Sequence, residues 1–254
     1  MKKNLIRIAI IGFVLVVIVG IVVIMFLGQI VKKGVETAGP MVTKVEVKLD
    51  KASISLLGGS AHLKGLFVGN PPGYKTESAI KVGVVSVSLK PLSVLSDKIV
   101  IESVKVESPE ITIEGGIKDN NLTKILNNVT AEAGGSDTTM KKDEKASGKK
   151  IQVTDLTITG AKVHANTLLS GGKTITVSLP DIHLTNLGTS SDGITSAELT
   201  KVVMDAVMGK VVPALTEGLA NAGMEALNLG NGTTEGAKKG VEKVTGGLKG
   251  LFKK

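Results

Sequence analysis

The chain has 254 residues, a formal net charge of +8 and no cysteine, which excludes disulfides, cysteine nucleophiles and thiolate metal sites. Arginine occurs only once, at Arg7, and aromatic residues make up 2% of the chain. Bidentate base contacts and base stacking are therefore almost unavailable, and we expect no nucleic-acid partner despite the positive charge. The apolar residues are mainly Val, Ile and Leu, which fit a β-sheet.

An uncharged apolar stretch runs from Ile8 to Val31. Roughly 20 apolar residues cross the hydrocarbon core as a helix, so residues 1–33 are predicted to be a transmembrane anchor. Three basic residues precede the stretch and two lysines follow it, which favours a cytoplasmic N-terminus and a domain on the far side of the membrane. A cleaved signal peptide ending near residues 37–39 is the alternative, which the length of the stretch disfavours.

The segment after the anchor predicts a first β lobe over residues 42–130. Alternating apolar residues up to Leu57, followed by Gly58-Gly59, indicate a hairpin. The pattern apolar-x-apolar-x-x-apolar-x-apolar then begins at Ala61 and recurs at Ile99 and at Ile151. Because strand side chains alternate between faces, the extra residue requires a bulge or a bend to keep both apolar pairs on one face.

The second and third copies of this pattern also agree further along the chain. Ile111 is in step with Val163 at the same offset that relates Ile99 to Ile151. This agreement indicates a repeated β unit.

A short helix is expected to end the first lobe, with Asp119 or Asn120 as its cap. Its apolar face follows the i, i+3, i+4, i+7 spacing and comprises Leu122, Ile125, Leu126 and Val129. Residues 131–150 are polar and predict a flexible linker, and residues 151–190 predict a second lobe of four strands.

The last part of the chain changes to helical spacing. Thr195 and Glu198 form a capping box at the start of a long helix over residues 195–229, which Pro213 is expected to kink. Its apolar stripe is expected to pack on the sheet and comprises Leu199, Val202, Val203, Ala206, Val207, Ala214, Leu215 and Leu219.

The tail over residues 230–254 is basic and rich in glycine. An amphipathic helix at a membrane interface and a frayed solubilising tail are both compatible with it. In the first case the residues expected to contact the membrane are Lys238, Lys239, Leu248, Leu251 and Phe252.

These elements predict an α+β fold that is mainly β. It has an N-terminal transmembrane helix, a repetitive and curved antiparallel sheet that forms a β-groove, and C-terminal amphipathic helices.

Part of the sequence resembles the AsmA-like family. The segment from Leu63 to Tyr74, LKGLFVGNPPGY, is similar to a strand and turn near the start of these proteins. The strand from Ile99 towards Pro109 and the segment NNLTKIL from Asn120 are similar to the strand and the helix that follow. The resemblance covers about residues 42–129.

The resemblance implies a bacterial inner-membrane protein with a periplasmic domain, related to the AsmA and TamB group. Those proteins are associated with outer-membrane biogenesis and with phospholipid movement along an apolar β-groove. This chain is much shorter, since roughly ten strands at about 4.8 Å reach on the order of 50 Å, close to the thickness of one bilayer. A transport role between two membranes would therefore need partners or self-assembly.

No constellation typical of catalysis or metal binding is visible, so a non-enzymatic protein without a cofactor is expected. The three histidines, His62, His164 and His183, lie in predicted strands without a second ligand at metal spacing, and we expect them to face solvent.

The favoured hypothesis is lipid handling, with membrane lipids and other envelope proteins as partners. The residues expected to bind acyl chains are Leu63, Leu66, Val85, Val87, Ile101, Val104 and Val153. The alternative is a scaffold that recruits a protein through a sheet edge, its groove closed by its own helix. The sequence leaves the lipid and the oligomeric state open.

Overall fold

The computed structural model describes residues 2–116, 119–134, 149–166, 174–189 and 192–230, apart from some side chains in the first and last helices. The helices are α1 (Lys2–Thr43), the 3-10 helix η1 (Pro91–Leu95), α2 (Asn121–Gly134) and α3 (Ser196–Gly230). The strands are β1 (Val47–Ser55), β2 (Ser60–Val68), β3 (Ile80–Leu89), β4 (Lys98–Glu107), β5 (Glu110–Glu114), β6 (Lys150–Thr159), β7 (Lys162–Asn166), β8 (Thr174–Ser178) and β9 (Ile182–Leu187).

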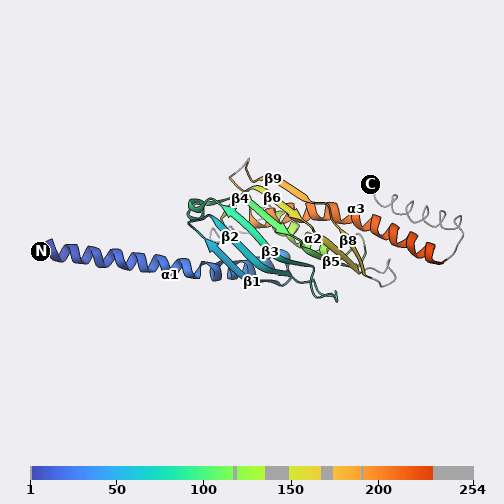
Figure 1. Ribbon diagram of the computed structural model, residues 1–254, viewed down its shortest axis with the longest axis horizontal. Coiled ribbons are helices and arrows are strands. Elements are labelled where there is room, and N and C mark those ends of the chain that lie inside the picture. Colours follow the sequence, from blue (N-terminus) through green and yellow to red (C-terminus); the bar gives the residue numbers. More distant parts are fainter. Residues whose placement is uncertain (1, 117–118, 135–148, 167–173, 190–191, 231–254) are drawn as a thin grey trace.

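All the described strands belong to one nine-stranded sheet (Figure 1), so the strands of the two predicted lobes lie side by side. The hairpin of β1 and β2 is antiparallel, as predicted. The prediction of a wholly antiparallel sheet was wrong, because β4 pairs with β6, and β5 with β7, in parallel. Parallel neighbours need a long crossover, and the chain between β5 and β6, which includes α2, provides it.

The predicted repeat is confirmed by the strand register. Ile99 is paired with Ile151 and Ile111 with Val163, an offset of 52 residues in both cases. β4 and β5 thus form one long strand that is interrupted at Ser108-Pro109, and β6 and β7 form its parallel copy, interrupted at Gly160-Ala161. Ser108 and Gly160 both have a positive φ, at 49° and 63°, and the amide of Ser108 donates to the carbonyl of Thr159 over 2.8 Å.

A third interruption, at residues 179–181 between β8 and β9, lies beside the second, since the amide of Leu179 donates to the carbonyl of Ala161 over 2.9 Å. We call this line of interruptions, residues 108–109, 160–161 and 179–181, the crease. The sheet changes strand pairing there, with β4, β6 and β9 on one side and β5, β7 and β8 on the other.

The predicted register reset is also present within β4. Ser88 of β3 pairs with Ser103, whereas the next residue, Leu89, pairs with Ile101, which leaves Glu102 as the extra residue of a bulge. In β2 the register does not shift, but Gly65, which lies between the two apolar pairs, has a φ of 64° that few other residues adopt. As a result, the apolar pairs before and after each irregularity face the same side.

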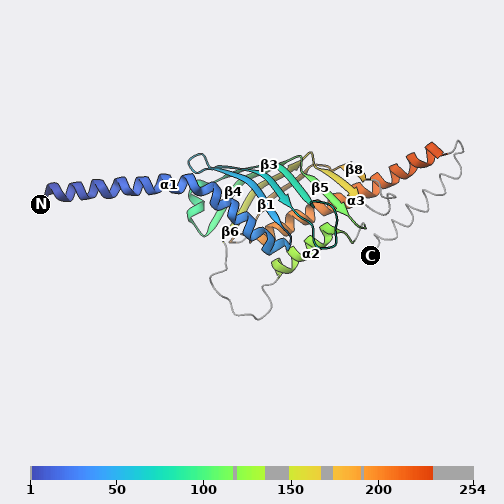
Figure 2. The same ribbon diagram turned by 90° about the horizontal axis from the view of Figure 1, so that it is seen from below.

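The helices cover that same side, which we call the inner face (Figure 2). α1 lies along β1, α3 packs on β6, β8 and β9, and α2 lies between α3, α1 and β5. The predicted face of α2 is confirmed, since Leu122, Ile125 and Val129 are buried in the core. In α3, the predicted stripe is largely confirmed, since Val207 and Leu215 are buried and Leu199, Val203, Ala206 and Ala214 pack against the core. Val202 is exposed rather than buried, whereas Met204 and Val211 are buried in addition, and the side chain of Leu219 lies outside the described residues.

α1 is longer than the predicted anchor and continues to Thr43, where Lys44 adopts a positive φ of 58° that ends the helix. Within the part of the chain whose side chains the structure describes, no helix is long and apolar enough to cross a membrane. The anchor over residues 1–33 stays a prediction.

Two buried asparagines connect α2 to the sheet. The side chain of Asn120 caps the helix by accepting from the amide of Thr123 over 2.9 Å, as expected. The side chain of Asn121 donates to Asn70 Oδ1 over 2.7 Å and to the carbonyl of Thr112 over 2.8 Å, and accepts from the amide of Glu114 over 3.0 Å. The turn after β2 and the start of α2, both of which carried the family resemblance, therefore meet in space.

Candidate functional site

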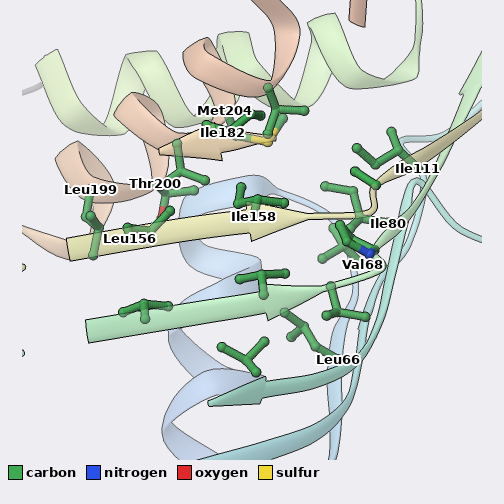
Figure 3. A pocket seen from close by; sticks show the side chains of 18 of the residues that line it. Leu66, Val68, Ile80, Ile111, Leu156, Ile158, Ile182, Leu199, Thr200 and Met204 are labelled. Carbon is green, nitrogen blue, oxygen red and sulfur yellow. The ribbon is translucent and has the colours of Figure 1, made fainter. Parts of the chain in front are cut away.

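An apolar cavity of about 300 Å³ lies between the inner face of the sheet and the helices (Figure 3). Its floor consists of residues from β2 to β6 and from β9, and its cover is the first half of α3 together with Ile125 of α2 and Thr43 of α1. In Figure 3, Leu156 and Ile158 of β6 point from the sheet towards Leu199, Thr200 and Met204 of α3. The volume is at the lower end of the range of roughly 300–1,000 Å³ for small-molecule sites.

The cavity lies at the crease. Pro109, Ala161 and Leu179, one residue from each interruption, are among its lining residues. The cavity therefore lies where the strands of the sheet are interrupted.

The lining offers almost no polar group to a ligand. Thr43 and Thr200 are the only polar residues among the described residues of the lining, and both hydroxyls donate within their own helices. Thr43 Oγ1 donates to the carbonyl of Gly39 over 2.8 Å, and Thr200 Oγ1 donates to the carbonyl of Ser196 over 2.7 Å. The cavity is therefore suited to a hydrocarbon and contains nothing that would recognise a polar head group.

The apolar surface continues beyond the cavity along the inner face as a strip of cross-strand rows, which we call the groove. Directly paired residues face the same side of a sheet, so each cross-strand row can be followed from a cavity residue. Val106 lines the cavity, and its row contains Leu63, Val85, Ile158 and Ile182. Val104 also lines the cavity, and its row contains Ala61, Val87, Leu156 and Leu184.

Two more apolar rows extend this face away from the crease. The first contains Leu89, Ile101, Val153 and Leu187, and the second contains Ile99 and Ile151. Most residues of this face on β2, β3 and β4 are half-buried, because α1 packs on β1 and α3 on β6, β8 and β9. Ala61, Val82 and Val85 are buried. From Ile99 to Val106 the groove is about 23 Å long, at roughly 3.3 Å per residue.

The seven residues predicted to bind acyl chains all lie on this inner face. Leu66, Val85 and Val104 line the cavity itself. Leu63, Val87 and Ile101 are half-buried in the groove, whereas Val153 is fully buried in the core and has no open surface. The residues expected to contact a membrane through the tail, beginning with Lys238, lie outside the described residues.

The structure adds cavity residues that the sequence analysis did not single out as ligand-binding. Those on strands are Val68, Ile80, Val82, Val106, Ile111, Leu156, Ile158 and Ile182, and those on α3 include Thr200, Val203 and Met204. The three copies of the apolar pattern were the signal for half of these strand residues, namely Val68, Val106, Leu156 and Ile158. The cover was predicted in part, since Leu199, Val203 and Val207 belong to the stripe expected to pack on the sheet.

The histidines lie apart from the cavity. His62 and His183 are exposed, as expected, whereas His164 is half-buried beside Thr176, whose hydroxyl lies 3.0 Å from its Nδ1. His183 pairs with Asp155 on the neighbouring strand. Among the residues that the structure describes, no group of three or more His, Asp or Glu side chains is arranged to hold a metal ion.

Two carboxylates stabilise segments near the ends of the groove. The capping box at the start of α3 is confirmed, with Glu198 Oε2 accepting from the amide of Thr195 over 2.6 Å, and this bond lowers the pKa of Glu198. Burial alone would raise the pKa of Glu114, but hydrogen bonds from the amides of Thr76 and Lys75 outweigh it and lower that pKa.

The chain matches no protein-family model and no curated protein sequence.

Proposed function

We propose that this protein is a membrane-anchored, non-enzymatic lipid-handling protein that shields a hydrocarbon chain of a membrane lipid on the inner face of its sheet. The observation that carries the proposal is the continuous apolar surface that leads from the groove into the cavity at the crease. One leaflet of a bilayer is about 15 Å of hydrocarbon, half of roughly 30 Å, so a groove of about 23 Å is long enough for one acyl chain.

The chemistry of the lining supports a chain-binding rather than a head-group-binding role. The two hydroxyls of the lining are engaged within helices, and no charged side chain lines the cavity. The head group would remain outside, in water or at the membrane surface. The protein would then select lipids by their hydrocarbon chain and tolerate different head groups.

The anchor over residues 1–33, the cytoplasmic N-terminus and the periplasmic location belong to this proposal, as does the relation to AsmA-like proteins. The apolar stretch of α1 and the Asn70–Asn121 contact between the two resemblance motifs support them. Membrane lipids are the proposed partners, together with other envelope proteins for any transfer to a second membrane.

Photo-crosslinking of the full chain in lipid nanodiscs tests the proposal. The probe is a phospholipid with a diazirine in its acyl chain, and the cross-linked residues are mapped by mass spectrometry. We expect labels on Val85 and Val104, which line the cavity, and on the first half of α3. The adjacent Val84 is exposed and alternates to the outer face, so it serves as a control within the same peptide. Labels confined to α1, or equally strong on Val84, would contradict the proposal.

The scaffold hypothesis has less support. At one edge of the sheet, Pro180 separates β9 from β8, and β8 also packs against α3. At the other edge, α1 lies against β1, and its Glu36 Oε1 accepts from the amide of Leu49. A partner strand would therefore find two short segments at the first edge and a strand lined by a helix at the second.

A further inference from the structure

We propose that one end of the sheet inserts into the surface of the membrane that α1 would cross, through three exposed leucines. Leu57 in the turn between β1 and β2 is 97% exposed, and Leu92 and Leu95 of η1 are 83% and 85% exposed. We call these residues the leucine tip. The inference rests on the membrane anchoring proposed above and adds a second membrane contact to it.

The three leucines belong to one surface, although they come from two loops. The carbonyl of Gly59, in the turn that carries Leu57, accepts from the amide of Leu89 over 2.8 Å, and η1 begins two residues later. A Cβ on Gly59 would be 3.3 Å from the ring of Pro91, so the turn is packed directly against the start of η1. Both loops lie at the same end of the sheet in Figures 1 and 2.

α1 leaves the sheet at this end. Glu36 Oε1 accepts from the amide of Leu49, Lys32 Nζ donates to the carbonyl of Asp50, and Gly28 contacts the carbonyl of Ala52. The helix therefore runs antiparallel to β1, so its N-terminal part extends past the turn that carries Leu57 (Figure 2). The opposite end of the sheet, where β2 turns into β3 at residues 69–79, points away from that part of α1.

This register places the leucine tip on the membrane side of the level at which α1 would leave the hydrocarbon. Lys32 is the first charged residue after the apolar stretch from Ile8, so its contact with Asp50 marks where α1 would emerge from the hydrocarbon. β1 continues beyond Asp50 towards Leu57, on the side of this level where α1 is apolar. Phe26 and Ile30 of α1 are also exposed, which extends the apolar surface from the helix towards the tip.

The charges around the tip fit a bilayer that contains anionic phospholipid. Lys33, Lys51 and Lys90 are exposed at this end, where their ammonium groups can contact lipid phosphates while the leucines enter the acyl boundary. Ser55, Ser60 and Ser93 lie between them. This mixture of polar and apolar residues suits the membrane interface rather than the bilayer centre.

The apolar rows of the groove begin at this same end, with Ile99 and Leu89. A hydrocarbon chain could therefore pass from the leaflet into the groove without crossing water.

Depth-dependent fluorescence quenching of the full chain tests the inference. The chain has no cysteine, so single substitutions give one labelled site each. The variants are Leu57→Cys and Leu92→Cys at the tip, Leu15→Cys in the apolar stretch of α1, and Lys75→Cys in the turn at the opposite end. Each is labelled with an environment-sensitive dye and reconstituted in vesicles of phosphatidylethanolamine and phosphatidylglycerol that contain nitroxide-labelled lipids.

We expect severalfold stronger quenching at Leu57→Cys and Leu92→Cys than at Lys75→Cys, with shallow nitroxides more effective than deep ones. Leu15→Cys should be quenched best by deep nitroxides. Quenching of Leu15→Cys together with tip values equal to those of Lys75→Cys would overturn the tip and leave the anchor standing. If Leu15→Cys is also unquenched, the anchoring and the tip are both refuted. All four residues are exposed, so the substitutions leave the core intact.

Discussion

Replacing Val104 with Phe tests whether the cavity at the crease is real space that a ligand can occupy. A larger side chain in a well-packed core costs about 1–3 kcal/mol because neighbours must move. Val104 lines the cavity, so the added ring enters open volume, and we expect the free energy of unfolding to change by less than about 1 kcal/mol. Val163 is fully buried and does not line the cavity, so Val163→Phe is the matched control and should show the full cost.

The same substitution should displace the hydrocarbon. Phe is larger than Val by about four carbon atoms, and at about 0.8 kcal/mol per buried methylene the lost contact is about 3 kcal/mol, on the order of 100-fold in Kd. Hydrogen exchange of the full chain in nanodiscs measures stability, and cross-linking of the diazirine phospholipid at sub-saturating amounts measures occupancy. If Val104→Phe lowers the free energy of unfolding as much as Val163→Phe does, the cavity beside Val104 does not exist as open volume. If it leaves the cross-linking of α3 unchanged, the hydrocarbon lies elsewhere.

Three further predictions concern the segments that hold the groove in place. Asn121→Ala removes three hydrogen bonds and leaves buried partners unpaired, so it should lower the free energy of unfolding by about 3 kcal/mol in a denaturant titration; a loss below 1 kcal/mol would contradict the role of this side chain. The lowered pKa of Glu198 means that its stabilisation of α3 is present above the ordinary pKa of 4.5 and is lost as the pH falls through the lowered value. The protection factors of amides at the start of α3, corrected for intrinsic exchange, should therefore fall in acid in the parent and not in Glu198→Gln. Glu114→Gln should increase amide exchange at Lys75 and Thr76 severalfold at neutral pH while leaving the start of α3 unchanged, and equal exchange in parent and variant would refute the role of Glu114.

Local sequence patterns predicted those parts of the fold whose cause is local. The capping box of Thr195 and Glu198, the cap at Asn120 and the apolar face of α2 each depend on residues within one or two turns of helix. The copies of the apolar pattern placed the inner face correctly, because alternation and a bulge fix which side a residue faces.

Alternation does not determine strand direction, and this is where the prediction failed. A strand such as β6 shows the same apolar spacing whether its neighbour is parallel or antiparallel, so the parallel pairing of Ile99 with Ile151 needed three-dimensional information. The cavity was missed for a related reason, since it arises where α3 meets the crease, and the two are far apart in the sequence. The burial of Met204 and Val211 in place of Val202 likewise depends on how α3 lies over the sheet.

The constant spacing of 52 residues between the two parallel units has an implication for how such a sheet could grow. Each unit brings its own interruption to the same level as that of its neighbour, so a further tandem copy would widen the sheet by one strand spacing, about 4.8 Å, without disturbing the alignment. Engineered duplication of one 52-residue unit would therefore give a wider sheet with the same crease. The number of such units, and not a new architecture, would set the width of the apolar face.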